Sequence, residues 1–406
     1  MLRHLFFCSL GLCVLGARAD IPLDISGFGT LAIEHDGQRG ADWRSTSEEG
    51  VGVGRSSDSS GAVASLFGIQ ADSQLSAQWH ATFQVVDREL SNDSFGPYPE
   101  WANLRYSPSS NLHLRFGRIS NNTFIMSESR EVGYTRMMLN LPIIYVTDPI
   151  EYIDGGDASY DLRVGDATYH INLIGGQSDL HLTYAAGVVH YHFQEEGANL
   201  SANWHNHSWR LTYNQARVNS SGPLLSLYEA GLDQMSAAGV AGSSVIDNSV
   251  RFQGIPASFI SAGYTYDDGR WWVQSEFAHR DVASQLIQSL YGGYLNVGHH
   301  WQDLAVYTEY DHIHNSTGYT LPTLSSSNPL AAVVNGVDSG LTQAQNINAL
   351  SLGLRWDIKN NAAFKLEYTY FIKPELSVGP FINATSSFYS SSAHVQLIGA
   401  ALDVIF

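Results

Sequence analysis

The feature that most constrains this chain is a two-residue alternation of apolar and polar side chains that recurs along most of its length. It is clearest between Gln74 and Val85, where apolar residues and polar residues take alternate positions. Such alternation is typical of a β-strand with one face toward an apolar medium and one toward a polar medium. A single strand of this kind also suits a soluble sandwich, so the repetition along the chain decides between the two.

The repetition has the rhythm of a membrane barrel, in which strands of about ten residues are joined by short and long connections in turn. We predict sixteen strands, near 24–35, 62–71, 74–87, 98–107, 111–119, 153–164, 166–176, 198–205, 208–218, 257–267, 270–281, 290–299, 302–313, 345–358, 361–373 and 391–406. The chain has no apolar run of 18 residues after its first segment, so it offers no transmembrane helix. A membrane-resident chain without such helices requires a closed barrel, because every backbone polar group must be paired within the lipid.

The connections between these strands alternate in length. Short turns are predicted near Asp72-Ser73, Ser107 to Ser110, Gly165-Asp166, His205 to His207, Asp268-Gly269, His300-Trp301 and Lys359 to Asn361. Long loops are predicted at 36–61, 88–97, 120–152, 177–197, 219–256, 282–289, 314–344 and 374–390. The sequence therefore predicts a 16-stranded antiparallel transmembrane β-barrel with periplasmic turns and extracellular loops.

The first residues have the pattern of a secretory leader. The apolar run Leu5–Gly16 follows Arg3, and Ala17-Arg18-Ala19 is a small-x-small cleavage site. We expect residues 1–19 to be a signal peptide and 20–406 to form a single barrel in the bacterial outer membrane. Both cysteines lie in the leader, so the predicted mature chain has neither a thiol nor a disulfide.

The charge balance excludes one class of function and supports the barrel. Acidic residues outnumber basic ones by 39 to 21, for a net charge of −18, which opposes binding to nucleic acid through a basic surface. Charged residues make up only 15% of the chain, below the roughly 25% that is usual for soluble domains.

Two of the long loops leave alternatives open. Residues 177–197 either form a hairpin arm above the membrane or shift the eighth strand. In the loop 219–256, Leu225, Tyr228, Leu232 and Met235 have helical spacing, which predicts a helix within 224–240, packed on a loop or acting as a lid over a ligand.

The third long loop carries the most specific sequence pattern. It contains the run Ser127-Glu128-Ser129-Arg130-Glu131-Val132-Gly133-Tyr134, after Gly117-Arg118-Ile119 and before Asp154-Gly155-Gly156-Asp157. With the opening Ser26-Gly27-Phe28-Gly29 and the terminal Phe406, this loop resembles the Gram-negative general porins. The likeness spans the mature chain in strand rhythm and is specific in these three places. One departure is the stretch Met138 to Pro142, which keeps one proline of the family's aromatic–Arg–Pro–Pro pattern and lacks its arginine.

The resemblance implies that residues 120–152 fold back into the lumen and form its constriction. Glu128 and Glu131 are the candidate acids of this constriction, and strand parity points Arg105 and Arg115 inward across from them. Arg118 lies where the wall meets the loop. Alternatively, Arg130 and Arg118 pair with Glu128 or Glu131 and pin the loop.

Parity also predicts further charges of both signs on the inner face. The additional inward charges are Arg210, Glu276, Arg280, Glu309, Arg355, Lys365 and Glu367. The loop acids Glu128 and Glu131, together with the negative net charge, predict a mild preference for cations, tempered by Arg105 and Arg115. Glu48 and Glu49, in the first loop, are expected to be exposed surface acids that matter little to selectivity.

We expect an outer-membrane porin that passes small hydrophilic solutes by passive diffusion. It would need no cofactor and would contact outer-membrane lipid and lipopolysaccharide, and the resemblance implies a homotrimer. The alternatives are a substrate-specific channel, or a surface adhesin or receptor that acts through 219–256 and 314–344. An enzyme is not expected, since the chain has no Gly-x-Ser-x-Gly motif. The pairs His190 with His192 and His312 with His314 share strand faces but show no third metal ligand, so no metal site is expected.

Overall fold

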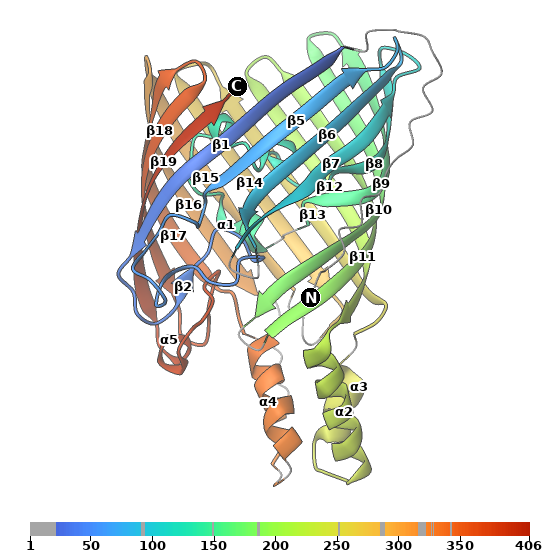
Figure 1. The fold of residues 1–406 in the computed structure, drawn as a ribbon, viewed down its shortest axis with the longest axis vertical. Helices are drawn as coiled ribbons and strands as arrows, with labels where there is room; N and C mark the ends of the chain where they lie inside the picture. The colour runs from blue at the N-terminus through green and yellow to red at the C-terminus, as the bar shows by residue number, and fades with distance from the viewer. Residues whose placement is uncertain are drawn as a thin grey trace, which may run out of the picture.

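A closed antiparallel β-barrel forms the body of the molecule in the computed structural model (Figure 1). The structure describes residues 22–406 apart from 91–93, 148–149, 185–186, 251, 285–288, 316–321, 326, 328 and 342, so the predicted leader 1–19 lies outside the described residues. Within these residues sixteen long strands follow one another around the barrel, and β19 closes it by pairing with β1. The strands are β1 Leu23–Asp36, β5 Leu66–Gln74, β6 Trp79–Glu89, β7 Phe95–Tyr106, β8 Leu112–Ser120, β9 Tyr152–Val164, β10 Ala167–Tyr184, β11 Gly187–Trp204, β12 His207–Ser221, β13 Ile255–Asp267, β14 Trp271–Val282, β15 Leu290–Trp301, β16 Leu304–Asn315, β17 Ile347–Lys359, β18 Ala362–Lys373 and β19 Ala393–Ile405.

The two faces of the wall have opposite chemistry, as the alternation predicts. On β1, Leu31 and Ile33 are 73% and 58% exposed, whereas Thr30 and Glu34 are 3% and 0% exposed. A wall that turns its apolar side chains outward and buries its polar ones needs lipid around it.

The predicted 16-stranded antiparallel barrel is therefore confirmed, with corrections at two turns. The first hairpin turns at 75–78 and not at Asp72-Ser73, and the turn after β15 lies at Gln302-Asp303 and not at His300-Trp301. Alternation alone could not locate these turns, because the residues on either side continue the two-residue pattern.

The segment 177–197 is not a loop. β10 and β11 continue through it as a paired hairpin, whereas β9 pairs with β10 only as far as Gln177. The end of this hairpin therefore extends past β9, which is the hairpin arm that the sequence left as one of two alternatives (Figure 1).

Helices gather beyond the end of the barrel that carries the long connections (Figure 1). They are α2 Pro223–Ala237, α3 Ser243–Ser249, α4 Pro329–Leu341 and the short α5 Ser386–Ser390. Tyr228 of α2 is buried and donates a hydrogen bond of 2.6 Å to Asp338 of α4. The helix predicted within 224–240 is confirmed as α2, whereas α4 was not predicted. No helix among the described residues has the length and apolar character to cross a bilayer.

The register of β6 gives a first testable prediction. Trp79 and Phe83 are 38% and 51% exposed on the outer face, and His80 and Thr82 have the opposite parity and contact Asp72. We expect cysteines at 80 and 82 to react with a water-soluble thiol reagent in intact membranes, and cysteines at 79 and 83 to resist it. The reverse pattern would contradict the register.

The barrel seam gives a second prediction, because the terminal residue helps to close it. Phe406 and Gly27 exchange two backbone hydrogen bonds of 2.8 and 2.9 Å, and the Phe406 ring stacks on Phe67 with 6.2 Å between centroids. The ring also lies so close to Gly27 that a Cβ there would be 2.3 Å from it. Deleting Phe406 is expected to reduce the yield of heat-modifiable barrel severalfold on gels, and Phe406→Tyr to preserve it. An unchanged yield from the deletion would show that the contacts of Phe406 at the seam are not needed for assembly.

Candidate functional site

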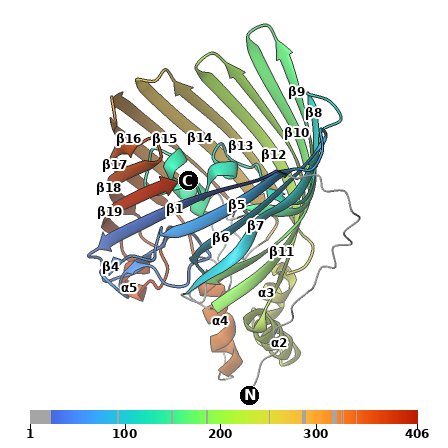
Figure 2. The same cartoon turned by 45° about the horizontal axis from the view of Figure 1, so that its top comes forward.

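The connection between β8 and β9, residues 121–151, contacts the inner wall on the far side of the barrel. It contains the short helical turns η1 Ser127–Ser129, η2 Gly133–Thr135 and α1 Ile143–Thr147. Figure 2 shows these turns in teal inside the ring of strand ribbons, and contacts join them to β1, β15, β16 and β19. We call residues 121–151 the crossing segment.

Charged side chains of the wall bind the backbone of the crossing segment. Carboxylates on β14, β16 and β18 accept its amide hydrogens: Ile125 N to Glu276 at 2.7 Å, Ile143 N to Asp311 at 2.9 Å, and Leu139 N to Glu367 at 3.0 Å. Cations on β17 and β18 donate to its carbonyls: Arg355 to Tyr134 O and Arg136 O at 2.7 Å, and Lys365 to Gly133 O at 2.7 Å. All of these inward charges except Asp311 were predicted from parity, and in the structure they hold a loop that has little regular hydrogen bonding of its own.

An apolar core fills the space between the crossing segment and this half of the wall. The rings of Phe124 and Tyr145 pack at a tilt of 33° with 4.3 Å between centroids, and Phe124 meets Phe259 of β13 edge to face at 5.5 Å. Trp43 of the first loop adds to the same core against Phe371, at 4.9 Å. Burial of these aromatic side chains packs the segment against this part of the wall.

A buried cluster of charges joins the first loop to the crossing segment. Arg88 of β6 pairs with Glu48 at 2.5 Å, with Glu151 at 2.9 Å and with Glu131 at 3.3 Å, and Arg130 pairs with Glu151 at 3.2 Å. Arg88 is itself only 7% exposed. We call these five residues the Arg88 cluster.

The Arg88 cluster changes the roles expected for three acids. Glu131 is 7% exposed and pairs with Arg88, so it holds the loop in place, as one alternative allowed, although its partner is neither Arg118 nor Arg130. Glu49 is only 3% exposed, and Glu48 pairs with Arg88. The expectation that Glu48 and Glu49 are exposed surface acids is wrong, because the first loop packs against the crossing segment.

The remaining candidates lie together on β7, β8 and η1. Arg115 binds Asp157 at 2.5 Å and Glu128 at 3.2 Å, and the Glu128 side chain is 54% exposed. Arg105 is exposed and lies directly opposite Arg115 in the strand register. Arg105, Arg115 and Glu128 therefore form a group of charges that solvent reaches, in contrast to the buried Arg88 cluster.

Arg118 has partners near the start of β9. It binds Asp154 at 2.6 Å, and its guanidinium lies 3.8 Å from the centre of the Tyr152 ring. Asp154 and Asp157 were not among the predicted site residues, although their spacing along β9 could have indicated that they face Arg118 and Arg115. No sequence signal pointed to Arg88 as the centre of a cluster.

Histidines do not form a metal centre in the part of the chain that the structure describes. No group of three or more His, Cys, Asp or Glu side chains there is arranged to hold a metal ion. His192 Nδ1 instead lies 2.9 Å from a carboxylate oxygen of Asp179, which accepts its hydrogen bond, and His312 contacts Asn348 at 2.8 Å.

The burial of the first-loop acids gives a prediction about pH. Burial raises the pKa of Glu48 from 4.5 to about 7, outweighing the opposite effect of Arg88, and burial likewise raises the pKa of Glu49 to about 7. Because the folded state favours the protonated forms, their contribution to stability is complete below pH 4.5 and is lost as the pH rises to about 7. The midpoint of thermal unfolding should therefore fall between pH 5 and pH 8, roughly.

The matched variants for this prediction are Glu48→Gln with Glu49→Gln, which should flatten that fall, and Glu229→Gln on the exposed face of α2, which should not. A wild-type midpoint that rises across the same range would contradict the assignment of buried neutral acids.

The fold of the whole chain is similar to that of solved structures, although its sequence does not identify a family. No family model and no curated protein matches it. An anion-selective porin from Comamonas acidovorans is 10% identical with a TM-score of 0.55, covering 95% of this chain and all of that one. The trimer form of OmpT, an outer membrane protein of Vibrio cholerae, is 9% identical with a TM-score of 0.54, covering 95% and 99%. The outer membrane channel DcaP of Acinetobacter baumannii is 9% identical with a TM-score of 0.54, covering 96% and 99%. These likenesses confirm the barrel fold.

Proposed function

We propose that this protein is an outer-membrane porin through which small hydrophilic solutes and ions diffuse passively. The observation that supports this most directly is the crossing segment, which is bound by charged side chains of the inner wall over β14–β18. A loop held in this way narrows the lumen without needing a cofactor, a metal or a catalytic group. The remaining width and the charges beside it would then select solutes by size and charge.

In this proposal the constriction lies between the crossing segment and the strands that it does not cover. Glu128 supplies the acid on the segment, and Arg115 and Arg105 supply the bases on the wall. Arg118 pairs with Asp154 and has the outward parity of Phe116, so it supports the wall beside the passage, and Glu131 acts indirectly by anchoring the segment.

We also propose that the barrel assembles as a homotrimer within outer-membrane lipid and lipopolysaccharide. Apolar side chains such as Leu31, Phe277 and Leu352 are 73%, 53% and 55% exposed on the outer face, and lipid or a second subunit would cover them. The trimer form of the similar Vibrio cholerae protein supports this stoichiometry.

The direct test uses the purified full chain in a planar lipid bilayer. Stepwise insertion with a steady ohmic current is expected, together with swelling of liposomes in solutions of small sugars that declines as the sugars become larger. A current no greater than that of the lipid alone would overturn the proposal.

The second candidate is a surface receptor or adhesin that acts through its long loops. It is supported by α2, α3 and α4, which stand beyond the barrel end as a packed helical unit (Figure 1). A barrel of this kind would insert in the bilayer but give little steady current, so the same measurement separates the two functions.

A further inference from the structure

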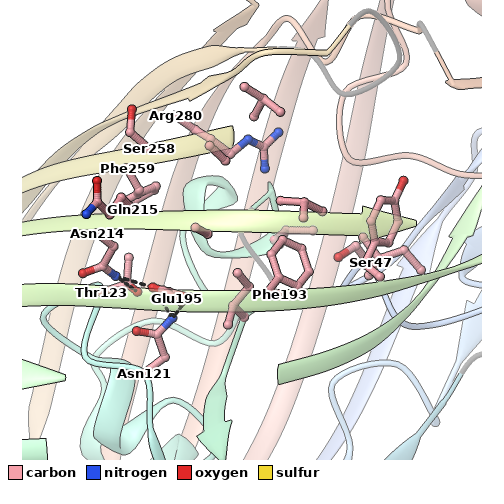
Figure 3. A pocket seen from close by; sticks show the side chains of 18 of the residues that line it. Ser47, Asn121, Thr123, Phe193, Glu195, Asn214, Gln215, Ser258, Phe259 and Arg280 are labelled. Carbon is pink, nitrogen blue, oxygen red and sulfur yellow. Dashed lines mark hydrogen bonds between the residues drawn. The ribbon is translucent and has the colours of Figure 1, made fainter. Parts of the chain in front are cut away.

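A cavity opens inside the barrel beside the crossing segment and near the long-loop end. It is lined by β10–β14, by the first loop and by the segment itself, it opens to solvent, and its volume is about 120 Å³ (Figure 3). Neither the anchors of the crossing segment on β16–β18 nor the Glu128–Arg115 group lines it. The proposed constriction therefore leaves the cavity's chemistry unexplained.

One part of the cavity is rich in hydrogen-bond donors and positive charge. Arg44 Nη1 donates to the backbone oxygens of Ser47, Glu49 and Thr183, each at 3.0 Å, which fixes the guanidinium in place. The Arg44 Nε and the Ser47 hydroxyl are buried, and neither has a hydrogen-bond partner among the described residues. Buried donors that lack partners carry a free-energy cost unless something supplies an acceptor.

Arg280 and two tyrosines complete this part. The hydroxyls of Tyr184 and Tyr191 lie 3.0 Å apart, so one phenolic hydrogen remains after they bond to each other. Arg280 is close enough to act electrostatically on both hydroxyls, and Arg44 on that of Tyr184. Two guanidinium groups and a phenolic donor together suit a carboxylate.

The opposite part of the cavity offers acceptors. Glu195 is 6% exposed and accepts hydrogen bonds from Asn214 at 2.6 Å and from Asn121 at 3.3 Å. The amide oxygens of Asn121 and Asn214 are buried without a hydrogen-bond partner in the described structure. A carboxyl group with two amide oxygens beside it suits a protonated amine.

An apolar stretch separates the two polar parts. Figure 3 shows Phe193 between Ser47 on one side and the hydrogen-bonded group of Glu195, Asn121 and Asn214 on the other. Phe259 and Val218 line the same cavity. An aromatic or branched apolar body fits such a lining, whereas a sugar would leave its hydroxyls without partners.

We propose that this cavity binds small zwitterions whose ammonium and carboxylate groups lie at opposite ends of an apolar body. The carboxylate lies toward Arg280 and Arg44, the ammonium toward Glu195, and the apolar body against Phe193. As a statement about which solutes the channel favours, this inference rests on the proposed function. As a statement about binding, it stands on the cavity alone.

Calorimetric titration of the purified full chain in detergent tests the proposal with three probes of similar shape. The zwitterion para-(aminomethyl)benzoate should bind at least about tenfold more tightly than para-toluate, which lacks the amine, or benzylamine, which lacks the carboxylate. Equal affinity for all three, or no binding of the zwitterion, would overturn it.

Two variants test which side chain binds each charged end of the ligand. Glu195→Gln should weaken the binding of the zwitterion and of benzylamine about tenfold and leave the affinity for para-toluate unchanged. Arg280→Gln should weaken the binding of the zwitterion and of para-toluate and leave the affinity for benzylamine unchanged. Glu196→Gln is the matched control, because Glu196 is the adjacent residue and is exposed. The assignment would be overturned if Glu196→Gln changed the three affinities as Glu195→Gln does. It would also be overturned if a single variant weakened the binding of both para-toluate and benzylamine.

Heat-modifiable migration on gels shows that each variant has folded, and Glu195→Asp should keep part of the amine selectivity if Arg280→Gln does not fold. Steady conductance without zwitterion binding would overturn this inference and leave the porin proposal intact. Zwitterion binding without steady conductance would support this inference and overturn the porin proposal.

Discussion

Replacing Arg88 by methionine is expected to release the crossing segment from the wall. The change removes the only cation within 4 Å of Glu48 and Glu131 in the described structure, and it leaves Glu151 with Arg130 alone. Removing one partner of a buried ion pair costs about 3–5 kcal/mol, because the remaining charges keep their burial without compensation. Amide exchange in 121–147 should accelerate by on the order of a hundredfold or more, and single-channel conductance should rise.

Arg39→Met provides the matched control, since the same side chain is lost from the same region. Arg39 pairs with Asp58 at 2.6 Å, but its side chain is 69% exposed, and an exposed ion pair contributes about 0–1 kcal/mol. If the two variants changed exchange and conductance equally, the Arg88 cluster would not be the anchor of the segment.

The second large effect concerns ion selectivity. Glu128→Gln is expected to shift the reversal potential in a salt gradient toward anions, because it leaves Arg115 with Asp157 as its only acidic partner in the described residues. Arg105→Gln is expected to shift it toward cations, since Arg105 is exposed opposite Arg115. Partly exposed pairs are worth about 0.2–1 kcal/mol, so each permeability ratio should change by about 1.4- to fivefold.

Two comparisons decide whether this group of charges is the filter. Glu229→Gln with Asp233→Asn alters exposed acids on α2, outside the barrel, and should have little effect at moderate salt, where charges are screened over about 8–10 Å. Glu131→Gln should loosen the crossing segment and change conductance more than selectivity, because Glu131 is buried beside Arg88. Equal selectivity shifts from the α2 pair and from Glu128→Gln would place the filter elsewhere.

Much of the wall could be predicted from the sequence, because the lipid imposes a simple pattern on it. The apolar face of Trp79 and Phe83, and the inward parity of Arg115, Glu276 and Lys365, follow from alternation alone. The pairing of β1 with β19 follows from closure, since an open edge would leave backbone groups unpaired in the membrane.

What could not be predicted depends on contacts between distant loops. Glu49 looks exposed in the sequence, because nothing near it indicates that the first loop packs against the crossing segment. The helix α4 is missed for a similar reason, since its apolar side chains are explained only by packing on α2. Parity could show that Arg355 and Lys365 point inward. It could not show that they would donate hydrogen bonds to the carbonyls of Tyr134 and Gly133.

The wall is thereby divided into two sectors with different tolerance to change. Strands β14–β18 use their inward charges to hold the crossing segment, so a substitution there disturbs the loop before it disturbs any solute. On β7 and β8, Arg105 is exposed, and Arg115 faces the solvent-exposed Glu128, so in the proposed channel a substitution of Arg105 changes the charge beside the passage while Arg115 keeps its bonds to Glu128 and Asp157. The barrel is in this sense modular, and new selectivities could be built on one sector of strands while the other sector is kept unchanged.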